Sequence, residues 1–144
     1  MVRAWLTACV MSTALAGSSC ALAAEGDCPQ LPEVGGLRWE QRALPDMVFC
    51  KAIGDEGELF SVTLGRSLPF RAVGSQQSGR GSIGGHKVRW YRGSDGFDPD
   101  LLLREALLKL GRGREAHIVV RARAEEALAQ RLQLAEQLRF DPEG

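Results

Sequence analysis

Two kinds of hydrophobic pattern run along this chain, alternation in most segments and a helical period near its end. Alternating or β-branched runs predict strands at residues 37–44, 47–53, 58–64, 87–92 and 116–122. In the third run Phe60, Val62 and Leu64 share one face, because side chains alternate across a strand. The second and third runs flank the Gly-bounded segment 54–57, and this arrangement predicts a β-hairpin.

Two further segments have the pattern of helices. The first, residues 101–110, is apolar nearly all round and ends at Gly111. It follows Asp98, a candidate N-cap, and Pro99 at the first helical position. The second, residues 124–140, carries apolar side chains at steps of three and four residues, which indicates an amphipathic helix.

The order of these elements predicts an α+β fold. We expect a single two-layer domain, with a mostly antiparallel sheet of about five strands and two helices on one face. The strand–helix–strand stretch 87–122 is compatible with one right-handed parallel crossover. Residues 65–85 are expected to form a long polar connection, in which 68–70 packs as a short apolar turn. Connections of this length are often functional or mobile.

The first 24 residues have the features of a cleaved signal peptide. Arg3 is followed by an apolar run at 4–17 and by small residues at 18–24. The apolar run is too short to cross a bilayer, so no stable membrane span is expected. We therefore predict an exported domain at 25–144, periplasmic or secreted. A lipoprotein anchored at Cys20 is the alternative, although Gly17 stands where such signals have a Leu-like residue.

Composition and charge narrow the class of protein. The chain has 144 residues, 44% hydrophobic and 25% charged, which excludes collagen-like and disordered chains. Eighteen Lys and Arg balance eighteen Asp and Glu, so the chain lacks the basic excess of a nucleic-acid-binding protein. Arg3 is the only charged residue before residue 25, so residues 25–144 have 17 Lys and Arg, 18 Asp and Glu, and a net charge of −1.

The cysteines indicate a disulfide. Two of the four, Cys9 and Cys20, belong to the predicted signal peptide, and the exported part keeps Cys28 and Cys50. An even number of cysteines in an exported chain predicts a bond between them. Their spacing is not CxxC, so a catalytic redox pair is not expected. The bond would tie the irregular arm at 25–36 to the strand that carries Cys50.

Several motifs that could carry chemistry lack their structural context. Residues 79–84 match GxGxxG, but no predicted strand precedes them and no helix follows, so we expect a flexible loop. His86 and His117 are the only histidines after residue 24, which is too few for a typical zinc site. The aspartates near residue 98 lack the closing Glu of a calcium loop. No catalytic residue, metal or cofactor is therefore predicted.

One constellation remains as a candidate binding surface. Arg89 and Tyr91 should share a strand face opposite to Val88 and Trp90. Arginine and tyrosine anchor protein interfaces, and arginine binds anions. With the basic residues of the adjoining loops, the candidate binding residues are Arg89, Tyr91, Arg66, Arg71 and Arg80. A solvated outer sheet face would give the same pattern.

Two functions are compatible with these features. The first is an exported non-enzymatic binding domain of the cell envelope, inhibitor-like or immunity-like, whose partner is another envelope or secreted protein. The second is a small envelope hydrolase or anion-binding enzyme that uses His86 with Asp95 and Asp98. A pocket joining His86 to these acids would favour the enzyme, and a basic-aromatic sheet face would favour the binding domain.

Overall fold

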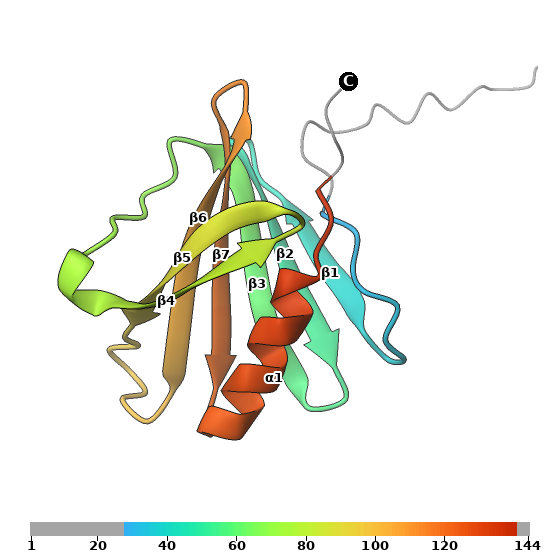
Figure 1. Ribbon diagram of the computed structural model, residues 1–144. Coiled ribbons are helices and arrows are strands. Elements are labelled where there is room, and N and C mark those ends of the chain that lie inside the picture. The colour runs from blue at the N-terminus through green and yellow to red at the C-terminus, as the bar shows by residue number, and fades with distance from the viewer. Residues whose placement is uncertain (1–27, 141–144) are drawn as a thin grey trace, which may run out of the picture.

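The computed structural model describes residues 28–140, which form one antiparallel sheet and a single α-helix (Figure 1). The strands are β1 (Arg38–Ala43), β2 (Met47–Gly54), β3 (Gly57–Arg66), β4 (Gln77–Ile83), β5 (His86–Gly93), β6 (Leu102–Gly111) and β7 (Arg114–Ala122). The helix is α1 (Glu125–Glu136), and a short 3-10 turn, η1, covers Gly74–Gln76. The predicted signal peptide, residues 1–24, and the possible lipidation site at Cys20 lie outside the described residues.

The sheet is built from two meanders. Its strand order is β1-β2-β3-β7-β6-β5-β4, so β3 and β7 pair where the meanders meet. Residues 67–76, which we call the crossover segment, connect β3 in the middle of the sheet to β4 at one edge. The other edge is β1. Every pairing is antiparallel, which confirms a mostly antiparallel sheet and excludes the parallel crossover with which residues 87–122 were compatible.

The hairpin predicted from residues 47–64 is confirmed. β2 pairs with β3 in the register that places Cys50 opposite Val62, and the turn closes between Gly54 and Gly57. Gly57 has a φ of +96°, a conformation that glycine adopts without steric cost. Local turn chemistry and alternation are sufficient to specify this unit.

The core lies on the face of the sheet that packs against α1, which we call the inner face (Figure 1). Phe60 of β3, Ile118 of β7 and Leu128 of α1 are buried together in this core. Trp39 of β1 extends this core, because its ring meets Phe60 edge-on at 5.9 Å between centroids. The opposite side of the sheet is the outer face.

The prediction of a helix at 101–110 is wrong, because these residues form β6. The strand lies between β5 and β7, and it directs Ala106 and Leu108 to the inner face and Leu107 to the outer face. A run that is apolar on all sides fits a strand covered on both faces as well as a buried helix. Asp98, the expected N-cap, instead accepts a hydrogen bond from Arg123 at 2.5 Å.

The numbers of strands and helices are corrected accordingly. Within residues 28–140 the sheet has seven strands rather than about five, and one α-helix rather than two. The additional strands are β6 and β4, and β4 covers part of the connection expected at 65–85. The GxGxxG residues 79–84 therefore lie on an edge strand and its turn, with no helix after them.

The irregular arm is fixed to the sheet as predicted. A disulfide joins Cys28 to Cys50 of β2, with their Cα atoms 5.9 Å apart. Beyond the cysteine, Gln30 and Arg139 exchange two backbone hydrogen bonds, so the arm pairs with the segment after α1. The helix expected over 124–140 ends at Glu136, and Leu138 is buried beyond it. In the part of the chain described, no helix is long and apolar enough to cross a membrane.

Candidate binding groove on the outer face

The side chains of strand β5 alternate between the core and the candidate binding surface. Val88 and Trp90 point to the inner face and are 6% and 4% exposed. Arg89 is exposed on the outer face, and Tyr91 is only half-buried there. Tyr91 is partly covered because the ring of Phe70 lies 6.0 Å from its own, between centroids. The residues of β5 that face inward and outward are therefore those that the alternation in the sequence predicts.

The crossover segment lies over the outer face. Leu68 is buried, and its backbone N–H donates to Glu115 Oε2 of β7 at 2.9 Å. Phe70 stacks on the imidazole of His117, with 4.8 Å between the ring centroids. The predicted apolar turn at 68–70 is thus packed against β7, and it forms one wall of a groove over the neighbouring strands.

This groove has a volume of about 790 Å³ and lies between the crossover segment and strands β4 and β5. Its apolar lining includes Phe70, Tyr91 and Leu107. Its charged lining consists of Arg80, Lys87 and Arg89, and no Asp or Glu lines it. We call it the basic-aromatic groove. Sequence reasoning named Arg80, Arg89 and Tyr91, and missed the other three residues.

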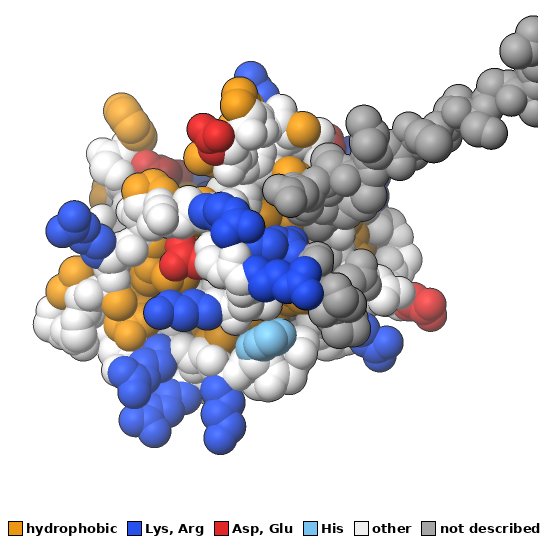
Figure 2. All heavy atoms as spheres, turned by 90° about the horizontal axis from the view of Figure 1, so that it is seen from above, with side chains coloured by type: hydrophobic (Ala, Val, Ile, Leu, Met, Phe, Trp, Pro, Cys, Tyr) orange, Lys and Arg blue, Asp and Glu red, His pale blue; other side chains and the backbone are white. Residues whose placement is uncertain are grey.

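The three cations of the groove have no ion-pair partner among the described residues. Within residues 28–140, none of them makes an ion pair or a side-chain hydrogen bond. Arg80 and Arg89 are directly opposite each other in the β4–β5 register. Like charges in that position destabilise a strand pair. In the view from above, Lys and Arg dominate the charged surface, with apolar side chains between them (Figure 2).

A His–carboxylate pair supports the wall of the groove. His117 Nε2 and Glu105 Oε1 are 3.2 Å apart, and the side chains are 20% and 26% exposed. A Cβ atom on Gly93 would lie 2.7 Å from Glu105 Oε2, so the missing side chain leaves room for this carboxylate. The pair fixes the imidazole on which Phe70 stacks. We assign it a positioning role for the crossover segment.

The other two candidate residues lie outside the groove. Arg71 lines a neighbouring hollow of about 370 Å³, which shares Phe70 and Tyr91 with the groove. Arg66 lies at the end of β3, where its Nη1 donates to the carbonyl oxygen of Arg112 at 2.6 Å. The structure therefore brings together three of the five predicted binding residues and places a fourth beside them.

The residues of the enzyme alternative do not form one site. His86 begins β5, whereas Asp95 follows the end of the same strand. The eight residues of β5 span about 25 Å at the usual rise of a strand. Asp95 accepts a hydrogen bond from the backbone of Phe97, and the His86 ring lies against Phe140. Each group has a local structural role.

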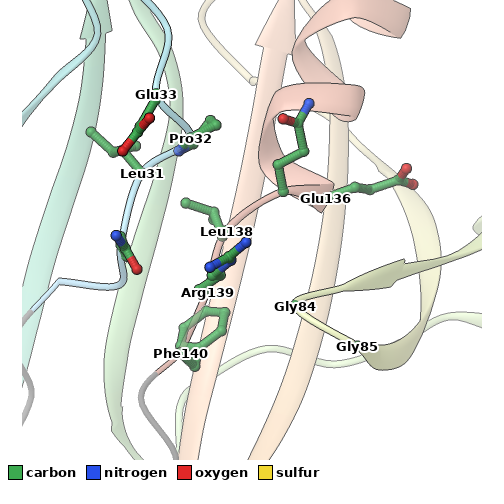
Figure 3. Close-up of a pocket in the computed structure, with 11 residues that line it drawn as sticks. Leu31, Pro32, Glu33, Gly84, Gly85, Glu136, Leu138, Arg139 and Phe140 are labelled. Carbon is green, nitrogen blue, oxygen red and sulfur yellow. The ribbon is translucent and has the colours of Figure 1, made fainter.

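A second cavity, of about 900 Å³, lies between the arm, the β4–β5 turn and the end of α1 (Figure 3). Leu31, Leu138 and Phe140 contribute its apolar surface, and its charges are of both signs, since Glu33, Glu136 and Arg139 all line it. It lacks the single-sign charge of the basic-aromatic groove. The groove is therefore the stronger candidate for ligand recognition.

Comparisons with known proteins found no relative from which a function could be inferred. No protein-family model, no curated protein and no solved structure matches this chain. Within the described range, no three His, Cys, Asp or Glu side chains gather closely enough to hold a metal ion. A functional proposal therefore rests on the chemistry of the groove.

Proposed function

We propose that this chain is an exported, non-enzymatic binding domain whose basic-aromatic groove binds an acidic segment of another envelope or secreted protein. The observation that carries the proposal is the Arg80–Arg89 pair, two uncompensated cations held opposite each other beside an apolar wall. An inhibitor-like or immunity-like role would use such a groove to recognise its partner.

Charge is the first reason for this ligand class. Like charges directly opposite on two strands cost several tenths of a kcal/mol. A carboxylate between Arg80 and Arg89 removes this repulsion, and guanidinium groups bind carboxylates with two parallel hydrogen bonds. The repulsion between the two arginines is present in the free protein and absent in the complex, so it adds to the affinity for an anion.

The apolar wall is the second reason. Phe70, Tyr91 and Leu107 offer aromatic and aliphatic surface within the same groove. An apolar side chain next to the carboxylate would bury this surface, at about 25 cal/mol per Å² removed from water. Arg80 and Arg89 are themselves exposed, which fits a partner that approaches across a surface better than an enclosed small molecule.

The compartment is part of the proposal. The Cys28–Cys50 disulfide supports an oxidising environment, in agreement with the predicted signal peptide at 1–24. N-terminal sequencing of the exported protein should find a start at residue 24 or 25. A chain that starts at a lipidated Cys20 would contradict soluble export.

Peptide binding tests the proposed ligand class. The probes are a fluorescein-labelled peptide with two aspartates around one phenylalanine and the same peptide with asparagines. We expect fluorescence anisotropy to show binding of the aspartate peptide alone, weaker at high salt because exposed charges are screened. The double variant Arg80→Ala/Arg89→Ala should lose at least tenfold in affinity.

The matched control is Arg42→Ala. Arg42 is an exposed cation on β1, at the opposite edge of the sheet, so the substitution changes charge without touching the groove. Its affinity should equal that of the unmodified protein. Equal binding of both peptides, or unchanged binding by the double variant, would contradict the proposal.

A further inference from the structure

The connection between β5 and β6 carries a fully exposed aromatic ring among acids. Phe97 is the most exposed large hydrophobic side chain of the described residues. It stands between Asp95, Asp98 and Asp100, and no basic residue lies between β5 and β6. We call residues 94–101 the acidic tip.

Three hydrogen bonds hold the acidic tip, two within it and one to Arg123, which follows β7. Asp95 Oδ1 accepts a hydrogen bond from the Phe97 N–H at 2.8 Å. Asp98 is anchored on both sides, because its carboxylate binds Arg123 and its carbonyl oxygen accepts from the N–H of Leu101. These contacts present Phe97 to solvent from a fixed loop, so little conformational entropy is lost when the ring is bound.

The acidic tip has the chemistry that the basic-aromatic groove lacks. The groove offers three cations without an ion pair and an apolar wall, and the tip offers the carboxylates of Asp95 and Asp100 and one unburied aromatic ring, while Asp98 is already paired with Arg123. We propose that the groove of one copy of this chain binds the acidic tip of a second copy. This inference rests on the proposed function, since it names the partner of the same site.

The positions of the two surfaces suit a closed dimer. A hollow lined by Phe70, Tyr91, Gly93 and Ser94 continues from the groove towards the tip, so both belong to one side of the molecule. Figure 1 shows the crossover segment and the β5–β6 connection projecting on that same side. A two-fold axis between them lets each tip enter the other copy's groove, which gives a self-complementary interface.

The net charge of the chain causes only weak repulsion between two copies. Residues 25–144 have a net charge of −1, so two copies repel each other weakly as they approach. The groove contacts are local, between cations and carboxylates. Association should therefore weaken as the salt concentration rises, because exposed charge pairs are screened.

Sedimentation velocity over a range of concentrations tests the dimer. The purified chain should show a reversible monomer–dimer equilibrium. The tip variant Phe97→Ser and the groove variant Arg80→Glu/Arg89→Glu should each raise the dissociation constant at least tenfold. All three substituted residues are exposed, and unchanged melting temperatures would verify that the variants fold. The control Arg42→Glu should dimerise like the unmodified chain.

Mixing the two variants gives a sharper readout. The groove variant keeps an intact tip, and the tip variant keeps an intact groove, so the mixture can form one of the two contacts. We expect heterodimers in the mixture at concentrations where each variant alone is monomeric. A chain that is monomeric at every concentration, or a dimer insensitive to both variants, would overturn the inference.

A labelled synthetic copy of residues 94–101 separates this inference from the proposed function. Binding of the peptide to the Phe97→Ser chain and its loss in Arg80→Glu/Arg89→Glu support the second-copy contact. If the aspartate–phenylalanine probe binds the groove but the chain remains monomeric, the second copy is wrong and the groove function stands. If neither peptide binds, both proposals fail.

Discussion

The two faces of the same sheet differ in their side chains and in what covers them. The inner face is apolar and covered by α1, with Phe60, Val62 and Ile118 fully buried. The outer face carries uncompensated cations beside aromatic rings, and a connection rather than a helix covers it. One strand, β5, contributes to both through alternate residues. Under the proposed function, stability and recognition belong to opposite sides of the same backbone, so substitutions should separate them.

The largest effect is expected for truncation on the inner face. Ile118→Ala removes a fully buried side chain at the centre of β7 and should lower the free energy of unfolding by about 2–5 kcal/mol. Urea denaturation measures the change. The control is Val119→Ala on the outer face of the same strand, where the residue is only half-buried, and the loss should be less than half as large.

Reduction of the disulfide should have the next largest effect. Closing the loop from Cys28 to Cys50 stabilises the fold by roughly 3 kcal/mol on the chain-entropy model. Denaturation with and without reductant measures this term, and the intact mass should rise by two hydrogens on reduction. Two free thiols in the protein isolated from its native cell would contradict the bond.

The third prediction concerns the Glu105–His117 pair that supports the groove wall. Gly93→Ala places a Cβ against the Glu105 carboxylate, which must move away from His117. Because this carboxylate is the far end of a flexible side chain, we expect a stability loss below about 1 kcal/mol, together with weaker peptide binding. Gly96→Ala is the control, because a Cβ there meets no atom within 4 Å. Equal effects of the two substitutions would argue against the positioning role.

The smallest effect on stability is expected in the groove itself. Arg80→Ala relieves the repulsion with Arg89 and should leave stability unchanged or raise it by about 0.3 kcal/mol. The gain should disappear at high salt. Thermal denaturation at two salt concentrations measures both effects. A clear loss of stability would mean that Arg80 supports the fold rather than a ligand.

Much of the candidate site follows from local pattern. Alternation alone places Arg89 and Tyr91 opposite Val88 and Trp90, because a strand has a period of two. The same pattern does not identify Phe70 or Leu107. Phe70 belongs to a connection, and its position on His117 depends on where that connection crosses the sheet. The helix that the sequence predicts over 101–110 would not place Leu107 on the sheet face that it lines.

The sequence by itself determined the β2–β3 hairpin, the Cys28–Cys50 bond and the amphipathic helix after β7. Each depends on short-range turn chemistry, on helical periodicity or on cysteine count. Only the tertiary structure decided that residues 102–111 form a strand and that the crossover segment covers the outer face. The physical reason is that a run apolar on both sides gives no period, so its conformation is set by the partners on its two faces. On the outer face that partner is Phe70 of the crossover segment, which lines the groove with Leu107 and lies far earlier in the chain.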